Sequence, residues 1–221
     1  MTNSREFFKK AFPFWKKISE DERKIILTGS SLIKYKNGQN IHDSTECTGV
    51  LVVKTGQLRI YMVSPEGKEI TLYKLNPYDV CMLSAACILN NIRFEVMVDA
   101  EKESEVYLIN PYKYKELKDK NIIVEQFTNS VINSSFSEAM WIMEQIVFMS
   151  FDKRLAIFLL EQSDSVKNDT LVLTHDYIAK NMGTAREVVS RMLKYFQTEG
   201  MVSLSRGTIV LIDKVKLRKL L

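Results

Sequence analysis

The sequence predicts an α+β protein with three successive parts: a β-rich N-terminal part, one long helix and a C-terminal winged helix-turn-helix. Between about residues 31 and 110, short runs of β-forming residues alternate with Gly, Asn and Pro. From Pro111 to about Gln162 the apolar residues recur every three or four positions, as they do in helices. Beyond residue 170, two short helical segments joined by Gly183 precede two short β-runs.

The composition is that of an ordinary globular protein. Of 221 residues, 46% are hydrophobic and 26% are charged. No apolar run approaches the roughly 18 residues of a membrane span, and the N-terminus lacks the features of a secretory signal. Three cysteines are too few for a disulfide framework and suit a reducing compartment. We therefore expect a cytoplasmic protein with no membrane partner.

Charge is unevenly distributed along the chain. Residues 153–221 carry a net charge of +5, whereas the first 152 residues carry −1. A basic C-terminal part suggests a polyanion as its partner. A net charge of +5 over 69 residues also lies within the ordinary scatter of charge along a chain, so charge alone does not decide the partner.

The first thirty residues are predicted to be helical. Ser19 followed by Glu22 fits a capping box, which begins a short helix that ends near Leu27. The β-runs that follow are separated by turn signals about every 8–12 residues, which is typical of a compact antiparallel barrel or roll. The alternating, half-buried strand positions are expected to be Val50, Val52, Ile60, Met62, Val96, Val98, Val106 and Leu108.

A helix of about 29 residues, roughly 43 Å long, is predicted next. It carries two apolar stripes, so we expect one stripe to cover the β-part and the other to contact a partner helix. This pattern favours a homodimer over a single buried amphipathic helix. Asp152 is predicted to cap the helix that follows. The stripes are Val124, Phe127, Val131, Ser134, Glu138, Trp141, Gln145 and Phe148, and Ile132, Phe136, Ala139, Met143 and Ile146.

The segment His175–Lys194 satisfies the constraints of a helix-turn-helix. Ala179 is small at the position where the two helices cross, and Gly183 permits the positive φ of a three-residue turn. Thr174 is a suitable N-cap. An ordinary αα-hairpin is the alternative interpretation. The core-facing positions are Ile178, Met182, Val189 and Met192.

The second helix of this motif is expected to begin near Thr184 and to present polar side chains to solvent. In a DNA major groove, Arg can donate two hydrogen bonds to guanine and Glu can accept one from cytosine N4. The two β-runs after Gly200 form a wing with a phosphate-binding residue near its tip. The candidate DNA-binding residues are Thr184, Arg186, Glu187, Ser190, Arg191 and, in the wing, Arg206.

Three segments carry a resemblance that covers nearly the whole chain: GQLRIYMVSPEGKEITLYKL, FDKRLAIFLL and TAREVVSRMLKYFQTEGMVSL. The chain resembles the family of the cAMP receptor protein and the fumarate-nitrate regulator. The resemblance implies a sensor domain with a cyclic-nucleotide-binding-type β-roll at 1–120, a dimerisation helix at 121–149 and a winged helix-turn-helix DNA-binding domain at 150–221. It further implies a homodimeric transcription regulator, often an activator, that binds an inverted repeat in double-stranded promoter DNA and contacts RNA polymerase.

The resemblance also implies which bases are recognised. Arg186, Glu187 and Arg191 match the base-recognising positions of the cAMP-receptor branch. Glu187, Ser190 and Arg191 match those of the fumarate-nitrate branch. The expected half-site is therefore similar to either TGTGA or TTGAT.

The family's cyclic-nucleotide cassette is incomplete in this chain. The stretch Asp79–Cys87 lacks the Gly-Glu pair that holds the ribose, and Arg93 is displaced from the phosphate position and lacks its Ser partner. A cyclic phosphate buried there would have little charge compensation, so we do not expect cAMP as the effector. The sequence identifies no other effector or cofactor.

Cys81 and Cys87 lie beside the family's effector pocket and, with Arg93, are the effector or redox candidates. Three interpretations remain open for the two cysteines: buried small hydrophobic residues, a thiol redox switch, or ligands of a metal or haem. His42 is expected to be an exposed turn residue.

Two other classes of function compete with DNA binding. One is a ligand- or redox-sensing regulatory module that acts through protein–protein contacts. The other is an enzyme, which is the weakest of the three classes because the sequence shows no nucleophile–His pair, no phosphate-binding loop and no spacing of metal ligands.

Overall fold

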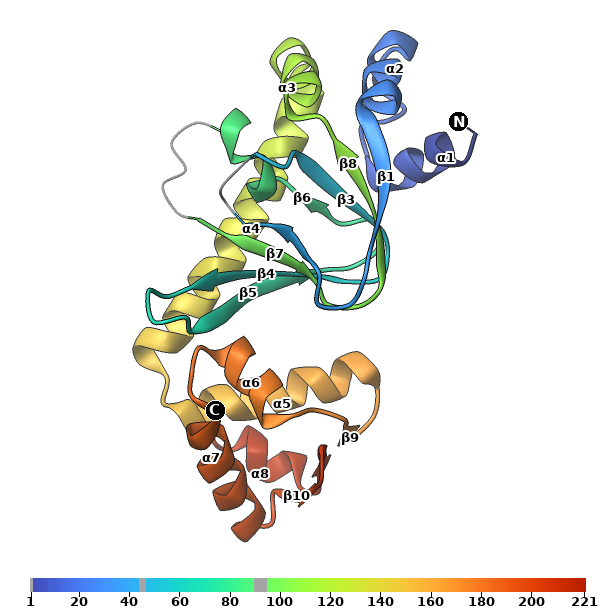
Figure 1. Ribbon diagram of the computed structural model, residues 1–221. Coiled ribbons are helices and arrows are strands. Elements are labelled where there is room, and N and C mark those ends of the chain that lie inside the picture. The colour runs from blue at the N-terminus through green and yellow to red at the C-terminus, as the bar shows by residue number, and fades with distance from the viewer. Residues whose placement is uncertain (1, 44–46, 90–94) are drawn as a thin grey trace. The chain divides into compact units, whose positions relative to one another are not determined.

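The protein is described by a computed structural model that covers residues 2–43, 47–89 and 95–221 (Figure 1). Its chain forms two compact units. Unit 1 comprises Met1–Met62 and Leu72–Ala139, and unit 2 comprises Val63–Thr71 and Met140–Leu221. Together they give the mixed helix-and-sheet content that the sequence predicts, with a β-roll, a long helix and a helix-turn-helix in that order.

The β-roll is built from two four-stranded sheets. One has the order β1-β8-β3-β6 and the other β2-β7-β4-β5, and all the pairings described are antiparallel. Antiparallel strands that return through short turns agree with the roll expected from the spacing of the turn signals. The strands are β1 (Ser30–Tyr35), β2 (Asn40–His42), β3 (Val50–Thr55), β4 (Leu58–Val63), β5 (Glu69–Leu75), β6 (Val80–Cys81), β7 (Met97–Ala100) and β8 (Ser104–Ile109).

Strand β3 contributes to two hydrophobic cores. Leu51 and Val53 pack with residues of the other sheet, such as Ile60 and Val98, in the core between the sheets. Val50 and Val52 pack in a second core, which contains residues of the surrounding helices. All four consecutive positions of β3 are completely buried. The predicted alternation of half-buried positions is therefore wrong for β3, because helices cover the face of the sheet that was expected to meet solvent.

Alternation also fails at Met62, the fifth residue of β4, whose side chain is exposed. In contrast, Val96, Val98 and Val106 are buried as predicted.

The second core contains residues of the helices that precede the β-roll in sequence and of those that follow it. Aromatic residues of the N-terminal segment pack in this core. The rings of Phe8 and Phe12, for example, stack with 5.5 Å between their centroids. Phe127 packs edge-on against Phe12 at 5.7 Å, which attaches the long helix to this core. The helices are α1 (Thr2–Ala11), α2 (Glu20–Gly29), the 3-10 helix η1 (Leu83–Ile88), α3 (Pro111–Lys120) and α4 (Ile122–Phe148).

The capping box predicted for the first short helix is present. Ser19 is the N-cap of α2, and its hydroxyl accepts a hydrogen bond from the Glu22 backbone N–H at 3.2 Å. In return, the Glu22 carboxylate accepts one from the Ser19 backbone N–H at 2.7 Å. These two bonds satisfy donors that a helix N-terminus otherwise leaves unpaired.

Helix α4 buries one face and exposes an apolar one. Val124 and Thr128 are buried, and Ala139 packs against the core between the sheets. The first predicted stripe contains buried, partly buried and exposed positions, and the second contains partly buried and exposed ones, so the predicted composition of the two faces is partly wrong. A repeat of three and four residues drifts by about 20° per heptad around a straight helix, which moves later members of a stripe onto another face. The exposed apolar face contains Phe136, Met140, Met143 and Val147.

Unit 2 has its own core, which α5 to α8 and a small sheet of order β10-β11-β9 surround. Helix α5 begins at Phe151, whereas a cap at Asp152 would place its first residue at Lys153. Its N-cap is Ser150, not Asp152. The Asp152 carboxylate instead accepts a hydrogen bond from the Ser150 hydroxyl within the first turn. The remaining elements are α5 (Phe151–Val166), β9 (Thr170–Leu171), α6 (His175–Met182), α7 (Arg186–Thr198), β10 (Val202–Ser205), β11 (Thr208–Leu211) and α8 (Lys214–Arg218).

Candidate nucleic-acid interface

Helices α6 and α7 form the helix-turn-helix predicted from the sequence. Thr174 is the N-cap of α6, and its hydroxyl accepts a hydrogen bond from the Tyr177 backbone N–H at 3.1 Å. Gly183 ends α6 in the left-handed conformation with φ 66° and ψ 37°, which glycine adopts without steric penalty. The Thr184 backbone N–H then donates to the Ala179 carbonyl at 3.2 Å, so the chain reverses tightly before α7.

The apolar side of the motif packs into the core of unit 2. Ile178 and Val189 are completely buried, and Ala179 is 6% exposed where α6 and α7 meet. Met182 is also buried, and Met192 packs partly buried against the same core. The core-facing positions predicted from the spacing are confirmed, and they determine which side of α7 remains outside.

The outer side of α7 carries the candidate base-recognising residues. Arg186 is the first residue of the helix, and Arg186, Glu187 and Arg191 are all exposed. The Arg186 guanidinium lies 3.8 Å from the Asp176 carboxylate, and both side chains are more than 60% exposed. An exposed pair of this kind stabilises a protein little, so the Arg186 side chain can be redirected toward a ligand.

Ser190 differs from its neighbours because its hydroxyl already has a partner. The Ser190 Oγ lies 2.7 Å from the Nδ1 of His175, and both residues are only partly exposed. The bond joins α6 to α7. No sequence pattern indicated this pairing, because it depends on the angle at which the two helices cross.

The predicted wing is present beside the helix-turn-helix. Strands β10 and β11 pair antiparallel, with Ser205 opposite Thr208. Arg206 and Gly207 form the turn between them, and Gly207 has a positive φ of 72°. Arg206 is exposed at this tip. Strand β9 pairs with the other edge of β11, which fixes the wing to unit 2.

A polar cluster anchors the wing side of unit 2. The Asp169 carboxylate accepts a hydrogen bond from the Ser163 hydroxyl at 2.7 Å and pairs with the Lys214 ammonium at 2.5 Å. The nearby ammonium, followed by the hydroxyl, lowers the pKa of Asp169. Ser163 belongs to α5, Asp169 directly precedes β9 and Lys214 belongs to α8, so the cluster joins α8 to the segment between α5 and β9.

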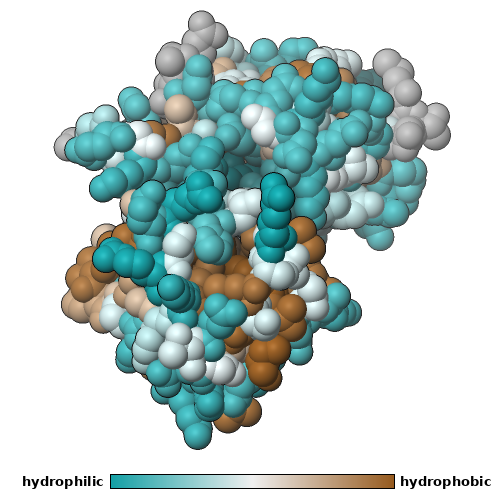
Figure 2. All heavy atoms as spheres, turned by 60° about the horizontal axis from the view of Figure 1, so that its bottom comes forward, coloured by the Kyte–Doolittle hydropathy of each residue, from teal (hydrophilic) through white to brown (hydrophobic). Residues whose placement is uncertain are grey.

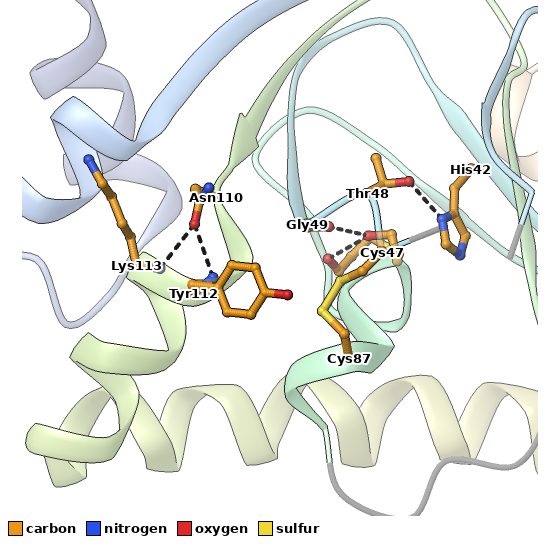
Figure 3. Close-up of a disulfide and its surroundings, with 10 residues drawn as sticks. His42, Cys47, Thr48, Gly49, Cys87, Asn110, Tyr112 and Lys113 are labelled. Carbon is orange, nitrogen blue, oxygen red and sulfur yellow. Dashed lines mark hydrogen bonds between the residues drawn. A yellow bond between two sulfur atoms is a disulfide. The ribbon is translucent and has the colours of Figure 1, made fainter. Parts of the chain in front are cut away.

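The effector and redox candidates of unit 1 lie in different environments. Cys81 is completely buried in β6, and burial raises the pKa of its thiol. Cys87, in η1, is exposed and forms a disulfide with Cys47 (Figure 3). No sequence signal indicated that pair, because three cysteines define no framework. Arg93 lies outside the described residues.

His42 is not the exposed turn residue that the sequence predicts. It belongs to β2, is 6% exposed, and its Nδ1 lies 2.8 Å from the Thr48 Oγ1 (Figure 3). Burial lowers the pKa of the imidazole, which favours the neutral ring.

The fold and the exposed face of α7 define a winged helix-turn-helix protein, and comparisons with known proteins agree. The family of Crp-like helix-turn-helix domains matches residues 153–220. A crystal structure from Eubacterium rectale ATCC 33656, assigned to the Crp/Fnr family of transcriptional regulators, is 43% identical and superposes with a TM-score of 0.91. That match covers 96% of this chain and 98% of the other.

Two curated proteins are more distant relatives. The cyclic AMP receptor protein of Thermus thermophilus is 23% identical over 201 residues, which are 90% of this chain and 92% of that protein. The regulatory protein HlyX of Actinobacillus pleuropneumoniae is 23% identical over 180 residues, which are 77% and 72% of the two chains.

The chain belongs to the Crp/Fnr family of transcription regulators. It is a DNA-binding transcription regulator. In the part of the chain that the structure describes, no helix has the length and hydrophobicity that crossing a bilayer requires.

Proposed function

We propose that this regulator binds, as a homodimer, an inverted repeat with TGTGA- or TTGAT-like half-sites, and that it does so without cAMP. The observation that carries the proposal is the exposure of Arg186, Glu187 and Arg191 on the outer side of α7. Arg191 donates to guanine and Glu187 accepts from cytosine N4 in the TGA-like core that both half-sites share.

The other candidate residues position the protein on the duplex. Arg206 at the wing tip contacts a DNA phosphate. Thr184, just before the N-terminus of α7, contacts the DNA backbone. Such contacts fix orientation and carry little sequence information. Ser190 contacts a base through the same hydroxyl that is bonded to His175. That hydroxyl either keeps its bond to His175 in the complex or exchanges it for a bond to the base.

The exposed apolar face of α4 supports the homodimer. Phe136, Met140, Met143 and Val147 recur at intervals of four, three and four residues and are 62%, 39%, 50% and 61% exposed. A second copy of the same face covers them in the dimer. More generally, Figure 2 shows apolar side chains, in brown, gathered in patches among hydrophilic ones on the face it displays.

The surroundings of η1 support a regulator that does not take cAMP. In Asp79–Cys87, Leu83 and Ala85 are buried and apolar. The one hydroxyl of this stretch, on Ser84, donates to the Gly49 carbonyl at 2.8 Å. These residues provide neither the charge nor the donors that a cyclic phosphate requires.

The remaining assignments follow from family membership. We propose residues 1–120 as the sensor domain, 121–149 as the dimerisation helix and 150–221 as the DNA-binding domain. RNA polymerase is the proposed second partner, and the cytoplasm is the proposed location.

Selection of binding sites from a random duplex pool tests the proposal directly. Purified, reduced protein without added ligand should enrich a two-fold inverted repeat whose half-sites are about one helical turn apart. Enrichment of a single unrepeated site would contradict the dimer. No enrichment at low salt, with cAMP restoring it, would contradict effector-free binding. No salt-dependent duplex binding under any condition would favour a module that acts through protein contacts.

A further inference from the structure

The disulfide of unit 1 connects two segments that are far apart in sequence. Cys47 precedes β3 and Cys87 lies in η1, with a sequence separation of 40 residues and 5.8 Å between their Cα atoms. We infer that Cys47 and Cys87 are a reversible thiol–disulfide pair, oxidised by low-molecular-weight disulfides and reduced by dithiols, whose oxidation state sets how firmly η1 is held against the start of β3. This inference does not depend on the proposed DNA target.

The two cysteines of the disulfide reach the protein surface, whereas the third cysteine does not. Cys87 is exposed and Cys47 is partly exposed. Cys81 is completely buried, and the raised pKa of its thiol leaves little of the reactive thiolate. Exchange with a small disulfide therefore takes place at Cys47 and Cys87 and spares Cys81.

The reaction balances without any further reagent. A thiolate of the pair attacks the small disulfide, forms a mixed disulfide and releases one small thiol. The second protein thiolate then attacks the protein sulfur of that mixed disulfide and releases the other small thiol. Two protein thiols and one small disulfide become one protein disulfide and two small thiols. A dithiol reverses the sequence and leaves as a disulfide itself.

Two hydrogen bonds between η1 and the start of β3 act beside the disulfide. The Gly49 backbone N–H donates to the Ser84 carbonyl at 3.2 Å, and the Ser84 hydroxyl donates to the Gly49 carbonyl at 2.8 Å. Helix η1 is a 3-10 helix that is interrupted by non-helical angles at Ala85 (φ −110°, ψ 38°). Such helices have poor hydrogen-bond geometry. The covalent bond therefore adds to these two hydrogen bonds and to the burial of Leu83, Ala85 and Ile88 in holding η1.

The segment from Cys47 to Gly49, on the other side of the disulfide from η1, also lies against the junction between β8 and α3. A Cβ atom added at Gly49 would be 2.5 Å from the Ile109 carbonyl oxygen and 3.2 Å from the Pro111 Cδ. Helix α3 is bonded in turn to α4, because the Tyr114 hydroxyl lies 2.9 Å from the Thr128 Oγ1, both buried. Packed contacts thus run continuously from the disulfide to the long helix within unit 1.

Two measurements on the full chain test the inference. Reduced protein is treated with oxidised glutathione, and its thiols are alkylated after unfolding and counted by mass spectrometry. We expect one free thiol, on Cys81, and a cross-linked pair of peptides containing Cys47 and Cys87. Hydrogen exchange of the amides of residues 83–88 should be at least about tenfold faster in the reduced protein than in the oxidised one.

Variants identify the residues responsible. Cys81→Ala, the matched control, should keep both the cross-link and the difference in exchange. Cys87→Ser and, independently, Cys47→Ser should exchange at the reduced rate under both conditions. Stable adducts of glutathione without the cross-link, or equal exchange in the two forms of the wild-type chain, would overturn the inference.

Discussion

The Nδ1 of His175 and the Oγ of Ser190 lie 2.7 Å apart, so a hydrogen bond joins the first residue of α6 to the outer part of α7. Each helix of the motif contributes one side chain to this bond, and the function of the motif requires the two helices to keep a fixed relative orientation. The bond therefore supplements the apolar contacts beneath it. It also couples Ser190, a candidate for base recognition, to a residue of the preceding helix.

Replacing either partner should loosen the motif to the same extent. We expect His175→Ala and Ser190→Ala each to lower the free energy of opening of α6 and α7 by about 1 kcal/mol, because each removes the same hydrogen bond. In the double variant the losses should not add, leaving a coupling energy of about 0.5–1.5 kcal/mol. Hydrogen exchange of the α6 and α7 amides measures these values. Ser203→Ala, in β10, is the control, and strictly additive losses would contradict the coupling.

Arg191 and Arg206 should affect DNA binding in different ways. Arg191→Ala should weaken binding to the selected duplex by about 1–3 kcal/mol and change binding to a random duplex little, because it removes a base contact. Arg206→Ala should weaken binding to both duplexes equally and reduce the slope of log affinity against log salt by about 1, because it removes a phosphate contact. Titrations at several salt concentrations measure both quantities.

Arg218→Ala is the matched control for both arginine variants. It removes the same charge from an exposed position in α8, so affinity for either duplex should change little. Equal losses on the two duplexes for Arg191→Ala would show that Arg191 does not recognise bases.

Gly49 should tolerate alanine far less than another glycine of the same unit. Both Gly49 and Gly38 have positive φ, at 112° and 77°, so alanine is strained at each. A Cβ atom at Gly49 would also meet the Ile109 carbonyl at 2.5 Å, whereas none of the described atoms lies within 4 Å of one at Gly38. We expect Gly38→Ala to lower stability by about 1 kcal/mol and Gly49→Ala by about 3 kcal/mol or more. Thermal unfolding compares them, and equal shifts would contradict the close approach.

The carboxylate of Glu22 should make unit 1 sensitive to acid. It accepts hydrogen bonds from the Asn121 side chain at 2.8 Å and the Ser19 backbone at 2.7 Å, and these bonds, the first most strongly, hold its pKa below the ordinary 4.5. The stabilisation is therefore fully present above about pH 4.5 and is lost as the pH falls through the lowered value. Glu22→Gln should lower the melting temperature at neutral pH and flatten its decline in acid.

Melting temperatures between about pH 3 and pH 6 check this prediction. Glu125→Gln, which removes an exposed carboxylate from α4, should leave the decline unchanged. An identical acid profile for Glu22→Gln and the wild-type chain would rule out the role of Glu22.

A charge on the apolar face of α4 should prevent dimerisation. Met143 is 50% exposed in the single chain and is covered in the proposed dimer, so Met143→Glu would bury an unpaired carboxylate there. We expect a dimer affinity at least about a hundredfold weaker, measured by sedimentation equilibrium. Ser137→Glu, an exposed position outside that face of α4, is the control. Dimers of undiminished affinity in Met143→Glu would place the interface elsewhere.

The features predicted correctly from the sequence are those that neighbouring residues determine. The capping box of Ser19 and Glu22, the N-cap at Thr174 and the turn at Gly183 each require residues only a few positions apart. The core positions of the helix-turn-helix follow from helical periodicity in the same way. These local patterns were enough to define the motif and its outer face.

The features that were missed depend on contacts between distant segments. Cys47 meets Cys87 because the antiparallel pairing of β3 with β6 brings η1 back to the start of β3. His42 is buried because β2 pairs with β7, more than fifty residues further along the chain, although its partner Thr48 is only six residues away. No periodicity in one segment contains this information, since it arises from the order of strands in the sheet.

The position of β3 between two cores has a consequence for how this protein can evolve. In a strand with one solvent-exposed face, every second residue can be replaced by various polar residues during evolution with little loss of stability. Val50, Leu51, Val52 and Val53 have no such residue, because odd and even positions alike fill a core. A polar substitution at any of the four would disturb the packing either between the sheets or beneath the helices. This segment is therefore expected to change only among apolar residues of similar volume, even where the surrounding loops diverge freely.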